Sequence, residues 1–595
     1  MIQTYEYDGF CKVELAFDAK EPVEVKSLQL EIPIRDEIVR YFNVLSRNDK
    51  RSGPAPDLTF PSGEGEVWNS ATNRTYNPGN LPAPIQNYIW LGGVEKGFAW
   101  LVQSFENWSL KPGYAPERAI RRDGAVTLVC DFVNEPVTWK GEKRITMYFE
   151  PTPVRPRDLK QLKFADYMYD YVWPTNSIRY AMTFGAGTMM FPMLTEPNRY
   201  PNGDKSLLRW KLNQRTLDDK AFWSRHAQYV ERNREWFSRQ YVTSVADFCS
   251  DRNKPRNCAC EYPLVYWNPR LSTVFWPEWK MYRAEWQVEP FPPFNFYNEY
   301  MCDVTPSRVD KLMWDARQSL DDGAAGLYYD CYNNMGGWCL ADGTAWVDPT
   351  RSVDNWGAAR VKLGNQLGWR EIMKRSSVLC QLYGCTYNGR PITELHDTDG
   401  NVAMVNAFSM TGLSTERGSD GGDFQDRFPE SFTLVNIIGG QTGKGSRIIV
   451  STRAGDQARK ERELKSLMGY LCAYGFFTMN DQGIIRREWF QKAWNIPFDY
   501  GIGEDRIEHH FYYDGKPQPF LHDAKDVRVN VLERKDGTGS LVLVGNLGDE
   551  TTFALRPASG AAFGYTDAMS GEVVDPSAVK VERHGFRMIF ANPVR

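Results

Sequence analysis

The sequence predicts a multidomain chain: an N-terminal β-sandwich, a central (β/α)8 TIM-type barrel and a small C-terminal β-sandwich. Three observations predict it. The chain has 595 residues. Its first part has the pattern of short alternating strands, its middle part alternates strands with longer helices, and its last part returns to strands. We expect the domains to span residues 1–156, 157–504 and 505–595.

The N-terminal prediction rests on alternating apolar and polar stretches at 11–17, 25–32, 98–105 and 126–133, separated by Gly, Pro, Asn and Asp. The stretch 142–156 ends in closely spaced prolines, which mark a boundary.

The central region changes to strands alternating with helices. We expect strands at 242–248, 263–268, 324–330, 390–396, 406–413, 446–452 and 476–481, and helices at 305–320, 354–379, 430–438 and 458–475. Units of this kind build a parallel sheet, and the length of the region together with the absence of GxGxxG after any strand favours a closed barrel. The stretch 527–555 then holds two alternating strands joined by a charged, Gly-rich turn.

Composition narrows the partners. A net charge of −4 argues against nucleic acid as the main partner, and no apolar run is long enough to span a membrane. The aromatic content of 14%, with 20 Trp and 30 Tyr, suits a sugar-type ligand, although core packing explains part of it.

The 11 Cys are scattered and are expected to be reduced. The start of the sequence resembles neither a signal peptide nor a transit peptide, so a cytoplasmic location and a removed leader both stay open. The oligomeric state is not predicted.

Polar residues follow the predicted strands of the barrel, where side chains face an active site. The residues at these strand ends are Asp330, His396, Asp397, Glu416, Arg417, Arg453 and Asp481. We expect His396, Arg417, Arg453 and Asp481 to contact a substrate. A buried histidine that serves only the core is the alternative for His396.

Two carboxylates from this set are the catalytic candidates, Asp330 and Glu416. Cleavage of a glycosidic bond needs one protonated carboxyl group and one ionised carboxylate. Asp330 follows an apolar run with Tyr329 and precedes a Gly-rich stretch with Trp338, and we expect both aromatic residues to bind substrate. The alternatives are a capping or loop carboxylate for Asp330 and an ion pair with Arg417 for Glu416.

A Trp-rich segment covers residues 266–286. Its tryptophans do not follow a clean helical period, which predicts a long rim loop in which Trp267, Trp276 and Trp279 bind substrate. A core role is the alternative.

Other chemistries are disfavoured. The chain has 6 His and no GxSxG, and HExxH is absent, so serine hydrolase and zinc protease mechanisms lack their residues. Asp420, Asp423 and Asp426 could hold a cation, but their spacing lacks a ligand-rich continuation. We predict no metal and no cofactor.

Several segments carry a family resemblance. WLGGVEKGFAWLVQSFENW at 90–108 and FEPTPVRP at 149–156 resemble the N-terminal sandwich of glycoside hydrolase family 123-like proteins, and GLYYDC with GLSTER more loosely resemble their catalytic barrel. The resemblance covers about 1–490 and implies a glycosidase acting on N-acetylgalactosamine, in which an adjacent Asp-Glu pair assists the substrate's own acetamido group. Here Cys331 follows Asp330, so that pair is missing.

A shorter likeness points to a second family. YYDCYN at 328–333 resembles the strand of α-galactosidase-type barrels whose Asp is the nucleophile, although the lysine of that motif is absent. The prediction is therefore a glycoside hydrolase that removes galacto-configured or N-acetylamino sugars from an oligosaccharide or glycan. The alternatives are an α-galactosidase-like retaining enzyme with Asp330 as nucleophile, a non-catalytic carbohydrate-binding protein, and a structural assembly protein.

Overall fold

The computed structural model divides the chain into two compact units. The first comprises 1–49, 59–155 and 180–410, and the second comprises 50–58, 156–179 and 411–595. The residues described are 1–44, 55–71, 86–111, 114–162, 180–183, 220–232, 262–269, 271–273, 277–286, 299–321, 323–330, 332, 346–347, 360–361, 365–397, 401–418, 423–451, 457–475, 478–481 and 488–594. The predicted strand at 242–248 lies outside them.

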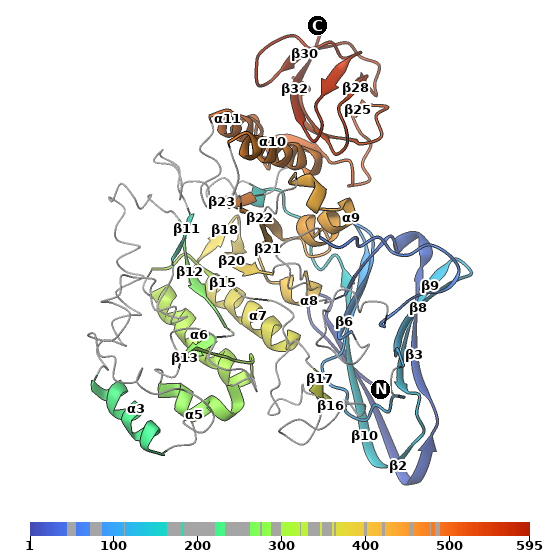
Figure 1. Ribbon diagram of the computed structural model, residues 1–595, viewed down its shortest axis with the longest axis vertical. Helices are drawn as coiled ribbons and strands as arrows, with labels where there is room; N and C mark the ends of the chain where they lie inside the picture. Colours follow the sequence, from blue (N-terminus) through green and yellow to red (C-terminus); the bar gives the residue numbers. More distant parts are fainter. Residues whose placement is uncertain are drawn as a thin grey trace. The chain divides into compact units, whose positions relative to one another are not determined.

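The first unit begins with a β-sandwich, drawn in blue to cyan in Figure 1. Its larger sheet has the order β1-β2-β10-β7-β6-β4, built from Ile2–Tyr5, Cys11–Val25, Val137–Thr152, Gly97–Leu101, Tyr88–Gly92 and Tyr41–Val44. Its smaller sheet has the order β3-β9-β8-β5, built from Leu28–Arg35, Ala125–Val133, Glu117–Arg122 and Gly65–Asn69, and the short helix η1 covers Asp36–Ile38. All the strand pairs are antiparallel.

Side chains from both sheets share one core. The alternation along β3, in which every second residue is half-buried, is the expected pattern of a sheet with one solvated face. The core residues include Val13, Trp100, Leu128 and Ile145, none more than 4% exposed. The N-terminal sandwich predicted by the alternating stretches is present.

Parallel strands follow in the first unit. The strands β11 (Tyr180–Thr183), β12 (Tyr262–Trp267), β15 (Gly326–Tyr329) and β20 (Thr393–His396) pair in this order. The helices α6 (Pro306–Asp321) and α7 (Gln366–Leu382) pack against each other and lie beside β15 in Figure 1. The remaining elements are α3 (Lys220–Arg232), α5 (Pro277–Trp286), α8 (Ala403–Asn406), and the short pairs β13 (Leu271–Thr273) with β14 (Glu299–Met301), β16 (Trp346–Val347) with β17 (Arg360–Val361), and β18 (Thr386–Tyr387) with β19 (Arg390–Pro391).

The second unit has its own parallel strands, β21 (Thr411–Gly418), β22 (Gly445–Ser451) and β23 (Thr478–Asp481). Its helices are η8 (Gln425–Arg427), α9 (Glu430–Phe432), η9 (Thr433–Ile438), α10 (Gln457–Tyr474) and α11 (Glu488–Tyr500). None of the helices among the described residues is long and apolar enough to cross a membrane.

The second unit ends in a small β module. One sheet has the order β24-β26-β27-β32-β30, from Ile507–His510, Val527–Arg534, Ser540–Asn546, Phe586–Pro593 and Phe563–Asp567. Two short pairs join β25 (Phe520–Leu521) to β29 (Arg556–Pro557) and β28 (Thr551–Phe553) to β31 (Val579–Val581). Helix α10 packs closely on this module. At Gly469 the approach is so close that an added Cβ would lie 2.3 Å from the carbonyl oxygen of His584.

Several expected elements need correction. Helix α7 begins at Gln366, after an Asn365 cap, rather than near 354, and β17 lies within the predicted helix. The predicted strand 406–413 begins only at Thr411, because α8 and a turn precede it. The parallel strands alternating with helices are present, whereas the closed (β/α)8 barrel and the domain boundaries 1–156, 157–504 and 505–595 stay predictions.

A buried arginine joins the sandwich to α7 within the first unit. The Arg370 guanidinium is 2.8 Å from Asp8 and 2.9 Å from Glu6, and it donates to the carbonyl of Met404 at 2.8 Å. Glu150 lies 3.9 Å away, and burial raises the pKa of its carboxyl well above the ordinary value. The planar guanidinium of arginine can donate to several acceptors at once. Removing one partner of such a network leaves the remaining charges buried and uncompensated.

We predict that stability falls with rising pH because of Glu117 in β8. Burial raises the pKa of its carboxyl to about 8 from an ordinary 4.5, so the folded chain holds this proton more tightly than the unfolded chain. The stability that the protonated Glu117 contributes is therefore complete below the pKa of this group in the unfolded chain. It is lost as pH rises through the pKa of the group in the folded chain. Glu117→Gln should raise Tm relative to the parent protein at about pH 9, and the gain should vanish near about pH 5.

The control is Glu31→Gln, which changes an exposed carboxylate in the same sandwich. It should leave Tm nearly unchanged at both pH values. A Glu117→Gln protein that is less stable than its parent at high pH would contradict the assignment.

Candidate active site

The strand ends of β12, β15 and β20 form one polar edge in the first unit. Trp267 pairs with Tyr329 and Tyr329 pairs with Leu395, so the residues that follow these partners lie level with one another. The Asp330 amide continues the ladder by donating to the Trp267 carbonyl at 2.7 Å. The carboxyl ends of parallel strands thus bring Asp330 and His396 together, as the sequence predicts.

The strands approach closely because of a glycine. A side chain at Gly326, the first residue of β15, would meet Leu264 of β12 at 2.2 Å and Ile392 at 2.5 Å. Gly326 therefore permits the spacing between β12 and β20 that fixes the position of Asp330 four residues later.

Asp330 and His396 are in direct contact. The Asp330 Oδ1 lies 2.6 Å from the His396 Nδ1, with the histidine side chain 8% exposed and the aspartate 19% exposed. The Tyr328 hydroxyl lies 3.1 Å from the same nitrogen. The contact with His396 fixes the orientation of the Asp330 carboxyl group.

Strand alternation divides the predicted residues between two faces. Asp330 and Tyr328 lie two residues apart on one face, which Glu394 and His396 of β20 share. Tyr329 points to the other face, where its hydroxyl lies 2.6 Å from Ser376 of α7. Trp267, the register partner of Tyr329, shares that face and is 0% exposed. Tyr329 and Trp267 are therefore both buried on the face opposite Asp330, and their predicted contact with substrate stays a prediction.

The Trp-rich segment also needs correction. Residues 277–286 form helix α5 rather than a loop, and Trp286 at its end is fully buried under the guanidinium of Arg308, 5.0 Å from the ring centre. The Trp286 indole donates to Ser307 at 2.8 Å. This tryptophan is a core residue.

The other predicted site residues are placed less fully. Trp276, Trp338 and Arg453 lie outside the described residues. Trp279 in α5, Glu416 and Arg417 in β21 and Asp481 in β23 have described backbones only. Asp330 belongs to the first unit and Glu416 to the second, so the pairing of these carboxylates stays a prediction.

Two residues on the Asp330 face were missed, Tyr328 and Glu394. Glu394 is 1% exposed, which is unusual for a carboxylate in a strand. The signal was available in the TELH stretch, because a residue two before His396 must share its face. Among the described residues, the side chains that could together hold a metal lie elsewhere, at Asp423, Asp426 and His584.

Comparisons with known proteins do not assign a family. No family model matches the chain, and no curated protein matches it. The α-galactosidase from Lactobacillus brevis aligns with a TM-score of 0.42 and 11% identity over 99% of this chain and 78% of its own. A family 36 α-galactosidase from Geobacillus stearothermophilus, solved with 1-deoxygalactonojirimycin, aligns with a TM-score of 0.45 and 11% identity over 98% of this chain and 80% of its own. A maltogenic α-amylase from Thermotoga neapolitana aligns with a TM-score of 0.37 and 10% identity over 60% of this chain and 82% of its own.

These TM-scores are below 0.5, so the likeness establishes neither the fold nor the activity of the chain. The resemblance to glycoside hydrolase family 123 likewise stays an expectation from the sequence.

We predict that Tyr329→Phe lowers the free energy of unfolding by about 1 kcal/mol, because it removes the buried hydrogen bond with Ser376. Sugar binding should be unchanged, since Tyr329 faces away from Asp330. Urea denaturation measures the first effect and calorimetric titration the second. A mutant that is fully stable but loses sugar affinity would restore Tyr329 to the binding site.

Proposed function

We propose that the chain is a glycoside hydrolase in which Asp330 is the ionised catalytic carboxylate. The observation that carries this proposal is the contact between Asp330 and His396 at the carboxyl ends of β15 and β20. An ionised, partly exposed carboxylate with a fixed orientation is what a glycosidase requires of its nucleophile or base. His396 is a positioning residue, since it acts through Asp330.

The reaction also requires an acid, and the sequence assigns it to Glu416 in β21. In the proposed mechanism the protonated Glu416 donates to the glycosidic oxygen as the bond to the anomeric carbon breaks. The ionised Asp330 attacks that carbon directly, or it removes a proton from an attacking water. These alternatives give retention and inversion, for which carboxyl separations of about 5–5.5 Å and about 6.5–9.5 Å are typical.

The substrate class follows from the sequence resemblances and the aromatic content. We propose galacto-configured or N-acetylamino sugars at the ends of oligosaccharides or complex glycans. A retaining, α-galactosidase-like reaction with Asp330 as the nucleophile is the variant that the YYDCYN likeness favours.

A second candidate function is carbohydrate binding without cleavage. The Asp330–Cys331 dipeptide favours it, because the Asp-Glu pair implied by the family resemblance is absent. Calorimetry that detects sugar binding, with no product after prolonged incubation, would select this candidate.

We predict that Asp330→Asn and Glu416→Gln each lower kcat by at least about 10²-fold on the glycoside that the parent protein cleaves. The measurement is release of nitrophenol from a panel that includes both anomers of galactose and N-acetylgalactosamine. Azide should restore turnover of Asp330→Gly if Asp330 is the nucleophile, since the anion fills the vacated space. Full turnover by both substituted proteins would exclude this carboxylate pair.

We predict that His396→Leu moves the acid limb of kcat/KM to higher pH, because loss of the N–H donor makes the Asp330 carboxylate easier to protonate. His396→Gln keeps an amide donor and should shift the limb less. Tyr329→Phe, on the opposite face, is the matched control and should not shift it. Identical pH profiles for all these proteins would remove His396 from the mechanism.

A further inference from the structure

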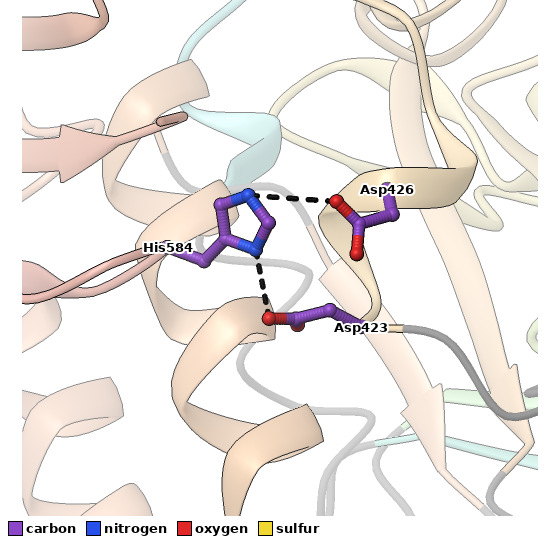
Figure 2. Close-up of side chains that lie close together, drawn as sticks. All are labelled: Asp423, Asp426 and His584. Atoms are coloured by element: carbon purple, nitrogen blue, oxygen red, sulfur yellow. Dashed lines mark hydrogen bonds and ion pairs between the residues drawn. The ribbon is translucent and has the colours of Figure 1, made fainter. Parts of the chain in front are cut away.

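Three ligand-type side chains meet in the second unit, far from one another in the sequence. Asp423 and Asp426 lie in the segment that follows β21, and His584 lies in the turn between β31 and β32. One nitrogen or oxygen from each comes within 4.8 Å of the others. Figure 2 shows the imidazole ring between the two carboxylates, one at each ring nitrogen.

The two contacts of the ring are different in kind. The His584 Nδ1 lies 2.7 Å from the Asp423 Oδ2, which is a charge-assisted hydrogen bond. The His584 Nε2 lies 3.6 Å from the Asp426 Oδ1, which is too long for a hydrogen bond. Two ligands that each lie about 2.0–2.2 Å from one divalent ion are separated by about this distance.

The imidazole is held in place. His584 is only 5% exposed, its amide donates to the Gly548 carbonyl at 3.2 Å, and its carbonyl accepts from the Gln425 side chain at 2.9 Å. Because Nδ1 lies at hydrogen-bond distance from Asp423, Nε2 is the ring nitrogen that is directed at Asp426.

We propose that His584 Nε2 and Asp426 bind a divalent transition metal of the Zn²⁺ type, with Asp423 as the carboxylate that orients the imidazole. Imidazole and carboxylate are ligands that Zn²⁺ accepts, and water completes the coordination. The ion would connect the segment after β21, the strand that carries Glu416, to the C-terminal β module. The proposal is independent of any glycosidase activity.

One neighbouring charge opposes the ion. The Arg583 Nη2 donates to the same Asp426 Oδ1 at 3.4 Å and competes with a metal for it. With two protein ligands and this competitor, the affinity should be modest. Removing the arginine should therefore strengthen binding, which a simple ion-pair role for the cluster would not produce.

The experiment is calorimetric titration of ZnCl2 into the chelator-treated full chain, with Tm measured in parallel. We expect a saturable site that raises Tm, and at least about 10-fold weaker binding in H584Q, D426N and D423N. Arg583→Gln should bind more tightly than the parent. Asp426 is 46% exposed, so D426N tests the site even if the buried His584 cannot be replaced without unfolding.

The matched control is Glu533→Gln, because His510 and Glu533 form another histidine–carboxylate pair in the same module, 3.3 Å apart. This substitution should leave the titration unchanged. Absence of saturable binding by the parent protein would overturn the proposal, as would equal affinity in the parent, H584Q and D426N. A Tm that responds to pH but not to ZnCl2 would assign the cluster to a proton instead.

Discussion

The buried guanidinium of Arg370 is the interaction on which the arrangement of the first unit depends. It reaches from α7 into the sandwich, contacts Asp8 at 2.8 Å and lies 4.0 Å over the ring of Phe10. A charge 2% exposed is tolerated only when acceptors surround it, so the sandwich and the helix must keep one relative position. The same helix supplies Ser376, which holds Tyr329 and thereby the strand that ends at Asp330. The position of the candidate carboxylate therefore depends on a charge cluster in the N-terminal sandwich.

The sequence could predict the strand ends because they follow from chain order alone. A strand that stops at an acidic residue and a later one that stops at a histidine must share an edge if both run parallel, which is how Asp330 and His396 were found. The sequence could not predict the faces. Alternation says that Tyr328 and Tyr329 point in opposite directions, but only the packing of α7 on one side decides which of them reaches Asp330.

The other incorrect predictions of secondary structure share a physical cause, because the local sequence pattern does not determine how these segments pack. The Trp-rich segment spans the end of β12 and helix α5, so no single period runs through it, and Trp286 contacts Arg308 and Ser307 outside its own helix. The predicted strand 406–413 contains a true strand only from Thr411, since Asn406 completes the turn of α8. The contact of His584 with Asp423 spans 161 positions, and no local pattern could signal it.

Two of the histidine–carboxylate contacts among the described residues are almost equal in length, 2.6 Å at Asp330 and 2.7 Å at Asp423. Their chemistry differs because of what occupies the rest of each imidazole. At His396 the Tyr328 hydroxyl lies near the same nitrogen as Asp330, so this side of the ring orients one carboxyl group at a strand end. At His584 the second nitrogen faces another carboxylate beyond hydrogen-bond distance, and this is where we propose that the cation binds. A short contact alone therefore does not define a role, because nearly the same distance occurs where one ring nitrogen has both contacts and where the second nitrogen faces another carboxylate.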